Sequence, residues 1–288
     1  MTTSTPPTST AAAHHPFVAL MRRYVVDYLV CRNTLVCAQI MEADYVLRMA
    51  DAELGPRDEV YVPAVATQLQ QFPGMGMTVH ELWLSHGEAP DRSDDRLAML
   101  FSQHGASALH NGAVAGWMGI GIYRWNGSRL TSNTALEDYE GRRNQLARTA
   151  PVARLPGPAL APWDEQPRAR SFTAEAAVRA WTQSPDWMDS PAIRRDSGTG
   201  EMLQFEVDRT TISETASAGR SVAFAGVVEG RYRGGLDVPP SCAGMQAVMH
   251  VMGLVSVDGG SNSTNIVSGH IVGGRGPLRR ALLKASAH

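Results

Sequence analysis

The chain has 288 residues, of which 43% are hydrophobic and 19% are charged, and its formal net charge is −2. This composition is typical of a globular protein, and the length suffices for two ordinary domains, each with a real core. The small net charge gives no electrostatic reason to expect nucleic acid or an anionic membrane as a partner. No apolar run approaches the roughly 20 residues of a membrane span. The three cysteines are an odd number, which favours a reducing, cytoplasmic location.

The segment 1–15 is rich in Thr, Ser, Pro and Ala, and we expect it to be a disordered tail. From Pro16 onward, apolar residues at spacings of three and four predict a helix up to Cys31. The same periodicity predicts a short helix over 35–41 and a longer one over 59–72. Alternating apolar residues predict strands over 45–50 and 78–84.

Two Asn-Gly pairs, Asn111-Gly112 and Asn126-Gly127, separate three apolar runs. Asn-Gly between strand-like runs is a strong signal for a tight hairpin, because a primed two-residue turn needs positive φ at both central positions. We therefore expect a three-stranded antiparallel meander, in which His110 pairs with Ala113.

The register of this meander can be counted back from the turns, and it places His104, Gly119 and Thr134 in one row. Since side chains alternate between the two faces of a sheet, one set of candidate functional residues then shares a face. That set is His104, His110, Trp117, Tyr123 and Asp138.

The second half of the chain begins after five prolines between Pro151 and Pro167, which predict a stiff linker over 150–172. A second unit over 173–277 opens with a helix and continues with four strand-like runs, at 201–214, 220–233, 245–257 and 265–273. This order echoes the first unit over 16–149 with its second and third helices reduced. The residues 278–288 are expected to form a C-terminal tail.

The run from Gly119 to Gly127, with Asp138 and Gln145-Leu146 behind it, resembles the SnoaL-like, polyketide cyclase-like branch of the nuclear transport factor two superfamily. The resemblance covers 16–149 well and 173–277 as a degenerate copy. It implies an α+β fold of two cone-shaped barrels, in which helices pack on a curved, mostly antiparallel sheet, as in cystatin-like folds. Because many relatives form dimers through their sheets, it also implies an intrachain pseudo-dimer, and homo-oligomerisation stays open.

The resemblance further implies cofactor-independent acid/base chemistry on a polyketide-like or other small hydrophobic carbonyl compound, of the cyclase, isomerase or dehydratase type found in secondary metabolism. Asp138 matches the position of the acid/base residue of this family. Where relatives carry a Gly-Thr-His motif, this chain has Gly105-Ala106-Ser107, so His104 or His110 is the candidate substitute.

A carboxylate at the floor of an apolar cone suits a proton shuttle, because burial raises its pKa toward neutrality. Asp138 is the candidate for this role, and the alternatives are that it caps the following helix or pairs with Arg142. His104 is a candidate partner acid or oxyanion donor, or else a structural histidine. The candidate substrate-binding wall, whose members are alternatively core or surface residues, is Trp117, Tyr123, His110, Tyr45, His80 and Arg48.

Two other functions stay open from the sequence. Epoxide opening of the polyether type needs two or more carboxylates around a bound nucleophile, and a non-catalytic module would only bind a small molecule or mediate assembly. The second unit has Gly273-Gly274 where the first has Asp138, so we expect it to be non-catalytic. The histidine pairs lack convergent carboxylates, and the sequence predicts neither a metal site nor a cofactor.

Overall fold

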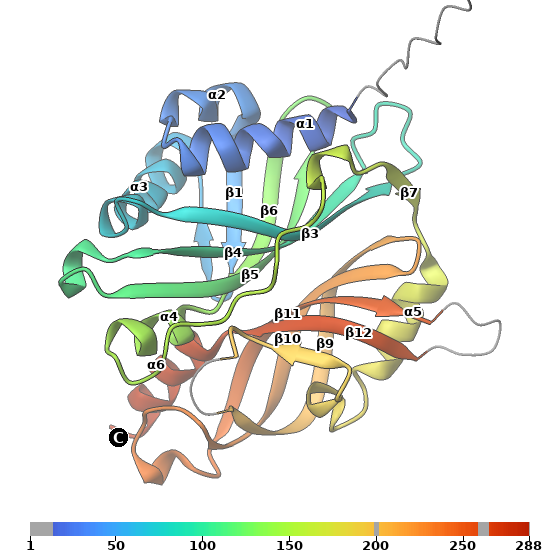
Figure 1. Ribbon diagram of the computed structural model, residues 1–288. Coiled ribbons are helices and arrows are strands. Elements are labelled where there is room, and N and C mark those ends of the chain that lie inside the picture. Colours follow the sequence, from blue (N-terminus) through green and yellow to red (C-terminus); the bar gives the residue numbers. More distant parts are fainter. Residues whose placement is uncertain (1–13, 199–201, 259–264, 288) are drawn as a thin grey trace, which may run out of the picture.

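The computed structural model describes residues 14–198, 202–258 and 265–287, so most of the predicted N-terminal tail lies outside it. Figure 1 shows three layers, in which helices lie on a first sheet and this sheet packs on a second one. The fold is therefore of the mixed α+β class that the sequence indicated. No helix among the described residues combines the length and the apolar character needed to cross a membrane.

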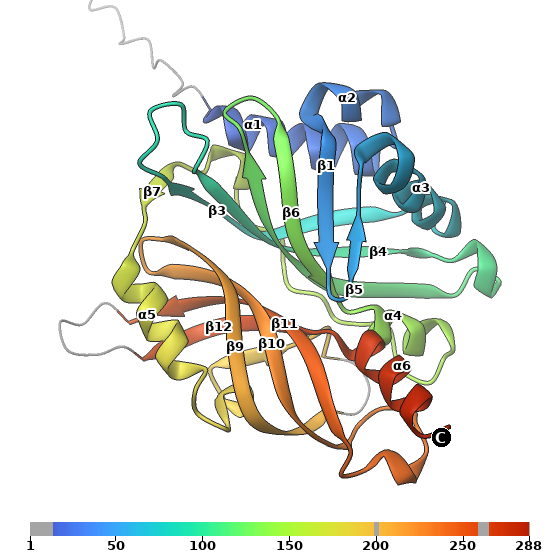
Figure 2. The same ribbon diagram turned by 180° about the vertical axis from the view of Figure 1, so that it is seen from behind.

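The first three helices of the first unit lie over one face of the first sheet (Figures 1 and 2). α1 (Pro16–Arg22) continues without a break into a π-helical segment over Arg23–Val30. The expected stripe is buried at Phe17 and Tyr24, while Cys31 is exposed. The remaining helices are α2 (Cys37–Ile40) and α3 (Val62–Gln71), the latter entered through a turn over Arg57–Tyr61.

The first sheet has seven strands in the order β2-β1-β6-β5-β4-β3-β7. β1 runs parallel to β6, and the central strands β3 to β6 form an antiparallel meander. The strands are β1 (Met41–Met49), β2 (Ala52–Leu54), β3 (Gly76–His86), β4 (Arg96–Ala106), β5 (Val114–Trp125), β6 (Leu130–Glu137) and β7 (Pro167–Ala169). The meander is followed by α4 (Tyr139–Leu146).

The predicted register of the meander is wrong. Gly119 pairs with Phe101 and Glu137 instead of His104 and Thr134, a shift of three residues on each side. The β4–β5 connection is longer than a two-residue turn because a 3₁₀ turn over Ala108–His110 precedes the left-handed Asn111. An odd shift exchanges the faces of the sheet, so Asp138 and His104 do not share a face with Trp117 and Tyr123.

The proline-rich segment lies along the first sheet and takes part in it. Its strand β7 pairs in parallel with β3, and the amide of Ala159 donates a 2.9 Å hydrogen bond to the carbonyl of Val79. The carbonyl of Ala169 accepts from Gly219 of the second sheet at 2.8 Å. The segment expected to be a stiff linker is thus hydrogen-bonded to both sheets.

The second unit repeats the strand order of the first in five strands, β8-β12-β11-β10-β9, with β8 parallel to β12 as β1 is to β6. It opens with α5 (Phe172–Trp181) and ends with α6 (Arg275–Ala285), where a tail was expected. The strands are β8 (Ile193–Arg195), β9 (Gln204–Ala218), β10 (Ser221–Gly234), β11 (Gln246–Val257) and β12 (Ile266–Gly273).

The two sheets pack together through an apolar cluster that draws side chains from both. Ile120 and Ile122 come from the first sheet, and Met252, Leu254 and Val272 come from the second. The opposite face of each sheet packs on helices and loops of its own unit. This sandwiching leaves the ends of β6 and β12, with α4 and α6, side by side at the boundary of the two units (Figures 1 and 2).

Candidate functional site

The candidate site lies where the short parallel strand β8 ends beside the last residue of β12. Asp196 follows β8 directly and has a left-handed backbone, with φ of 48°, a conformation that Asp tolerates better than most residues. Its counterpart after β1 is Ala50, with φ of 52°. The same topology therefore delivers a carboxylate to the second sheet at a place where the first sheet has a methyl group.

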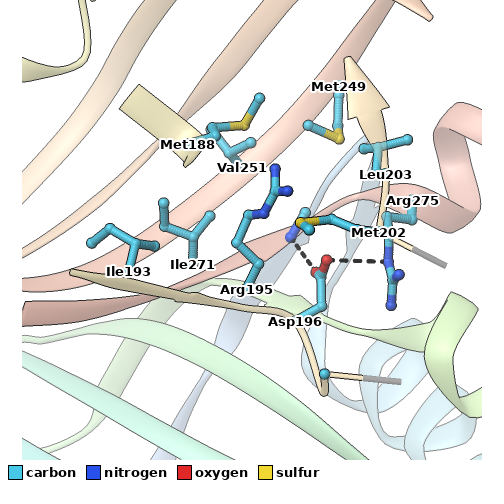
Figure 3. Close-up of a pocket in the computed structure, with 12 residues that line it drawn as sticks. Met188, Ile193, Arg195, Asp196, Met202, Leu203, Met249, Val251, Ile271 and Arg275 are labelled. Atoms are coloured by element: carbon cyan, nitrogen blue, oxygen red, sulfur yellow. Dashed lines mark hydrogen bonds and ion pairs between the residues drawn. The ribbon is translucent and has the colours of Figure 1, made fainter. Parts of the chain in front are cut away.

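Asp196 lies at the edge of a cavity of about 330 Å³ in the second unit. This volume falls at the lower end of the roughly 300–1,000 Å³ that is usual for small-molecule sites. Figure 3 shows mainly apolar and methionine side chains around the cavity, with Arg195, Asp196 and Arg275 as its charged groups. The apolar lining residues are Met188, Ile193, Met202, Leu203, Met249, Val251 and Ile271.

Arg275, the first residue of α6, stands between two carboxylates. Its Nη2 donates to Asp138 Oδ1 at 2.6 Å, and its Nε lies 3.2 Å from Asp196 Oδ2 without the alignment of a hydrogen bond. The amide of Gly273 donates to Asp196 Oδ1 at 2.8 Å. The amide of Ser197 donates to Asp138 Oδ2 at 3.0 Å, so the network joins the two units.

The pKa values of the two carboxyl groups, Asp138 and Asp196, are shifted in opposite directions. Burial opposes ionisation of Asp138, but Arg275 and the donors around it outweigh burial and hold its pKa below the ordinary value. For Asp196, burial is the largest influence, Arg275 opposes it and the charge of Asp138 adds to it, which raises the pKa to about 6. Asp196 can therefore gain and lose a proton near neutral pH, as a general acid or base must.

Asp138 itself is fully buried and does not line this cavity. Its carboxylate accepts from the amide of Gly141 at 2.9 Å and caps α4, so the capping alternative is confirmed. The other alternative, an ion pair between Asp138 and Arg142, is wrong, since Asp138 pairs with Arg275. Arg142 instead stacks over aromatic rings, with its guanidinium carbon 4.2 Å from the ring centre of Tyr139.

The carboxylate that faces the helix-covered side of the first sheet is Glu137. It accepts from Nε1 of Trp117 at 2.7 Å, and burial raises its pKa. Trp117, Tyr123 and Tyr45 lie on this side as expected, but they are packed core residues. Tyr45, for example, is fully buried and donates to Asn133 at 2.6 Å.

The other predicted site residues are scattered. His104 and His110 are exposed, and His110 hydrogen-bonds to Ser107 at 2.9 Å. Arg48 points outward and pairs with Glu53 at 3.0 Å, so no buried charge arises there. His80 is buried between two hydrogen-bond partners. The hydroxyl of Ser102 lies 2.8 Å from Nε2, and the carbonyl of Gly157 lies 2.9 Å from Nδ1.

Sequence reasoning missed both Asp196 and Arg275. A signal for Arg275 existed, because a cation in the first turn of a helix opposes the helix dipole unless a carboxylate accompanies it. Asp196 carried no such signal, since its strand has three residues and its partner β12 lies more than 70 residues away. Within the described residues, no group of three or more His, Cys, Asp or Glu side chains is placed to hold a metal ion.

No protein-family model matches the sequence, and no curated protein matches it either. Solved structures similar to this chain include wild-type IdmH, a candidate polyketide cyclase from Streptomyces antibioticus, with 17% identity and a TM-score of 0.37 over 46% of this chain and 99% of that one. A candidate SnoaL-like polyketide cyclase from Shewanella denitrificans has 14% identity and a TM-score of 0.38 over 46% and 99%. AclR, a candidate hydroxylase from Streptomyces galilaeus, has 14% identity and a TM-score of 0.37 over 45% and 94%. The chain is thus similar, over somewhat less than half its length, to solved structures of the SnoaL-like group that its sequence resembles.

Proposed function

We propose that this chain is an acid/base enzyme that binds a compact, mainly apolar carbonyl compound in the cavity beside Asp196. The observation that carries the proposal is a carboxylate with a pKa of about 6 at the edge of an apolar cavity. In its ionised form, Asp196 removes a proton from the carbon next to the carbonyl group and returns it at another position. The charge that develops on the carbonyl oxygen is stabilised by a nearby guanidinium, for which Arg195 is the candidate.

The arrangement around Arg275 supports this role in a second way. Because Asp138 holds the guanidinium at 2.6 Å, Arg275 is only partly available to neutralise Asp196. A fully paired Asp196 would have a low pKa and would be a weak base. Arg275, shared between two carboxylates, therefore leaves Asp196 basic enough to act. It still stabilises the ionised form of Asp196 in part.

Epoxide opening is the second candidate, favoured by the same raised pKa. Below about pH 6, Asp196 is protonated and can donate its proton to an epoxide oxygen while water or an internal hydroxyl attacks the ring carbon. Asp138 is the second carboxylate of the network, but it does not reach the cavity. After this donation, the ionised Asp196 takes up the proton that the attacking oxygen loses, which regenerates the acid.

One experiment separates these functions. The wild type is incubated in D₂O with a panel of cyclic ketones and the corresponding epoxides, and NMR follows deuterium uptake next to the carbonyl group and ring opening. We expect deuterium uptake that Asp196→Asn abolishes without loss of ligand binding. The matched control Asp208→Asn, which changes an exposed aspartate on β9, should behave like the wild type.

Ring opening without deuterium uptake would replace the first candidate by the second. Binding that is equal in the wild type and Asp196→Asn, with no conversion by either, would show a non-catalytic binding module. Undiminished turnover by Asp196→Asn would remove Asp196 from the mechanism.

A further inference from the structure

A second cavity, of about 480 Å³, lies between the two units and shares no lining residue with the cavity beside Asp196. Four arginines from four different segments line it, and we call it the arginine cleft. Arg96 comes from β4, Arg124 from β5, Arg170 from the segment between β7 and α5, and Arg179 from α5. Guanidinium groups that converge on one cavity repel one another unless negative charge accompanies them.

Two of the four arginines have a carboxylate partner. Arg124 lies 2.5 Å from Glu214, and Arg170 makes two hydrogen bonds to Glu175, at 2.7 and 2.9 Å. These two ion pairs account for two of the positive charges. They also fix the walls of the cleft, because Glu214 accepts from Thr134 of the first sheet and so links the two units.

The other two arginines, Arg96 and Arg179, contact neutral oxygens and form no ion pair within the described part of the chain. Arg96 donates to the carbonyl of Asp95 at 2.9 Å and to that of Ser93 at 3.3 Å. Arg179 donates to the carbonyl of Ile212 at 3.0 Å and to the hydroxyl of Thr215 at 3.2 Å. Since a guanidinium has five N–H donors, each retains donors for a ligand.

Glu88 and Asp94 also line the cleft, and within the described residues neither forms an ion pair with its arginines. Asp94 accepts from the amides of Glu88 and Ala89, at 2.7 and 3.0 Å, and is held in the loop by them. Glu88 is exposed. Burial, and then the neighbouring Arg124, lower the pKa of Arg96, although the charges of Glu214 and Asp94 oppose this shift.

We propose that the arginine cleft binds a phosphate group, either of an organic phosphate or of free phosphate, between Arg96 and Arg179. A phosphate monoester carries about −1.5 to −2 charges at pH 7, which matches two unpaired guanidinium groups. The planar donor pair of arginine also fits phosphate oxygens in a two-point contact. A cavity of this volume leaves room for a substituent on the phosphate.

The test is a calorimetric titration of the full chain with inorganic phosphate and with phenyl phosphate at low salt. We expect saturable binding that Arg96→Gln and Arg179→Gln each weaken by about tenfold or more. The matched control is Arg209→Gln, which changes an exposed arginine of β9 that pairs with Glu229 of β10. This variant should bind as the wild type does. Tighter binding of phenyl phosphate than of inorganic phosphate would identify an organic phosphate as the ligand, and the reverse would identify the free ion.

The proposal is overturned if the wild type shows no saturable binding, or if it and both variants bind equally. Arg179→Gln protects the test against a folding failure of Arg96→Gln, because Arg179 is exposed on α5 and its substitution leaves the core intact. Asp196→Asn should bind phosphate as the wild type does, so that the result is independent of the activity proposed above.

Discussion

Asp138 and Asp196, one from each unit, approach the same guanidinium, with Arg275 2.6 Å from the first and 3.2 Å from the second. One cation cannot neutralise two buried carboxylates, so one of them stays ionised and the other holds its proton more tightly. The shorter contact and the amide donors assign the ionised state to Asp138. A residue of the other unit thereby adds to the effect of burial on the titration of Asp196.

The first prediction concerns this coupling. Asp138→Asn removes the negative charge that raises the pKa of Asp196 and leaves Arg275 to Asp196 alone, so the pKa of Asp196 should fall below its value of about 6. Asparagine still caps α4, which keeps the helix in place. Carboxyl ¹³C NMR over a pH series measures the shift. An unchanged or higher pKa in the variant would show that Asp138 does not act on Asp196.

The second prediction concerns stability against pH. The folded pKa of Asp196, about 6, lies above the ordinary 3.8, so the folded state binds the proton more tightly than the unfolded state. The resulting stabilisation is complete below the ordinary pKa and is lost as the pH rises through about 6. A shift of this size corresponds to a loss on the order of 3 kcal/mol in the free energy of unfolding.

Urea unfolding of the wild type and Asp196→Asn at several pH values between about 4.5 and 7.5 checks this expectation. The variant should lack the decline that the wild type shows. Asp138 does not interfere in this range, because its lowered pKa makes its own contribution disappear only as the pH falls below the ordinary value. Parallel curves for the two proteins would contradict the raised pKa.

The third prediction concerns Glu175 in α5. Burial opposes its ionisation, but hydrogen bonds from Arg170, Thr215 and Ser217 lower its pKa to about 2. The stabilisation is present above the ordinary pKa of 4.5 and is lost as the pH falls toward 2. Glu175→Gln should therefore lower the free energy of unfolding by about 1–3 kcal/mol at neutral pH and by much less in acid.

Thermal unfolding at pH 7 and in acid measures the effect of Glu175→Gln. The control is Glu229→Gln, because the carboxylate of Glu229 is 40% exposed in its ion pair with Arg209 and should contribute little. Equal losses for the two variants at neutral pH would show that burial of the Glu175 ion pair has no special weight.

The fourth prediction concerns Gly119, in the middle of β5. A Cβ atom at this position would lie 2.4 Å from the ring of Phe101, which is buried and faces it across the strands. Gly119→Ala should therefore lower the free energy of unfolding by about 1–3 kcal/mol. Phe101→Leu, in the same chain, should recover part of the loss.

Chemical denaturation measures both changes, and Gly74→Ala is the matched control, because its added Cβ would have no neighbour within 4 Å. Recovery of nothing by Phe101→Leu would show that the loss comes from the backbone. The structure thus shows that Gly119 makes room for an aromatic side chain.

The sequence predicted the α+β class and the strands of the described residues except the three-residue β2, β7 and β8, because the apolar alternation of the longer strands is regular and Asn-Gly marks each end of β5. It could not predict the register. Asn111 adopts the left-handed conformation as expected, but a 3₁₀ turn lengthens the connection before it. Near the other pair, Asn126 accepts from the amides of Ser128 and Arg129 and forms a wider turn.

The candidate site was harder to predict for a related reason. A face assignment depends on register, so the same three-residue shift moved Asp138 out of the first interior and put Glu137 there. Asp196 follows a short strand, β8, that pairs with β12, an element distant in the sequence. The position of Asp138 before a helix was informative for its cap on α4, but it gave no sign of the ion pair with Arg275.

The segment between the two units is hydrogen-bonded to both sheets. Its strand β7 pairs with the first sheet, and the carbonyl of Ala169 accepts a hydrogen bond from the second unit. Without this segment, each half would have an unpaired strand edge. Separated from the other half, each would also expose an apolar face, which holds Ile120 in the first sheet and Leu254 in the second. Halves of this chain produced separately should therefore aggregate or bind other proteins nonspecifically, whereas halves produced together should associate and restore the complete fold. This protein is accordingly a candidate for fragment complementation.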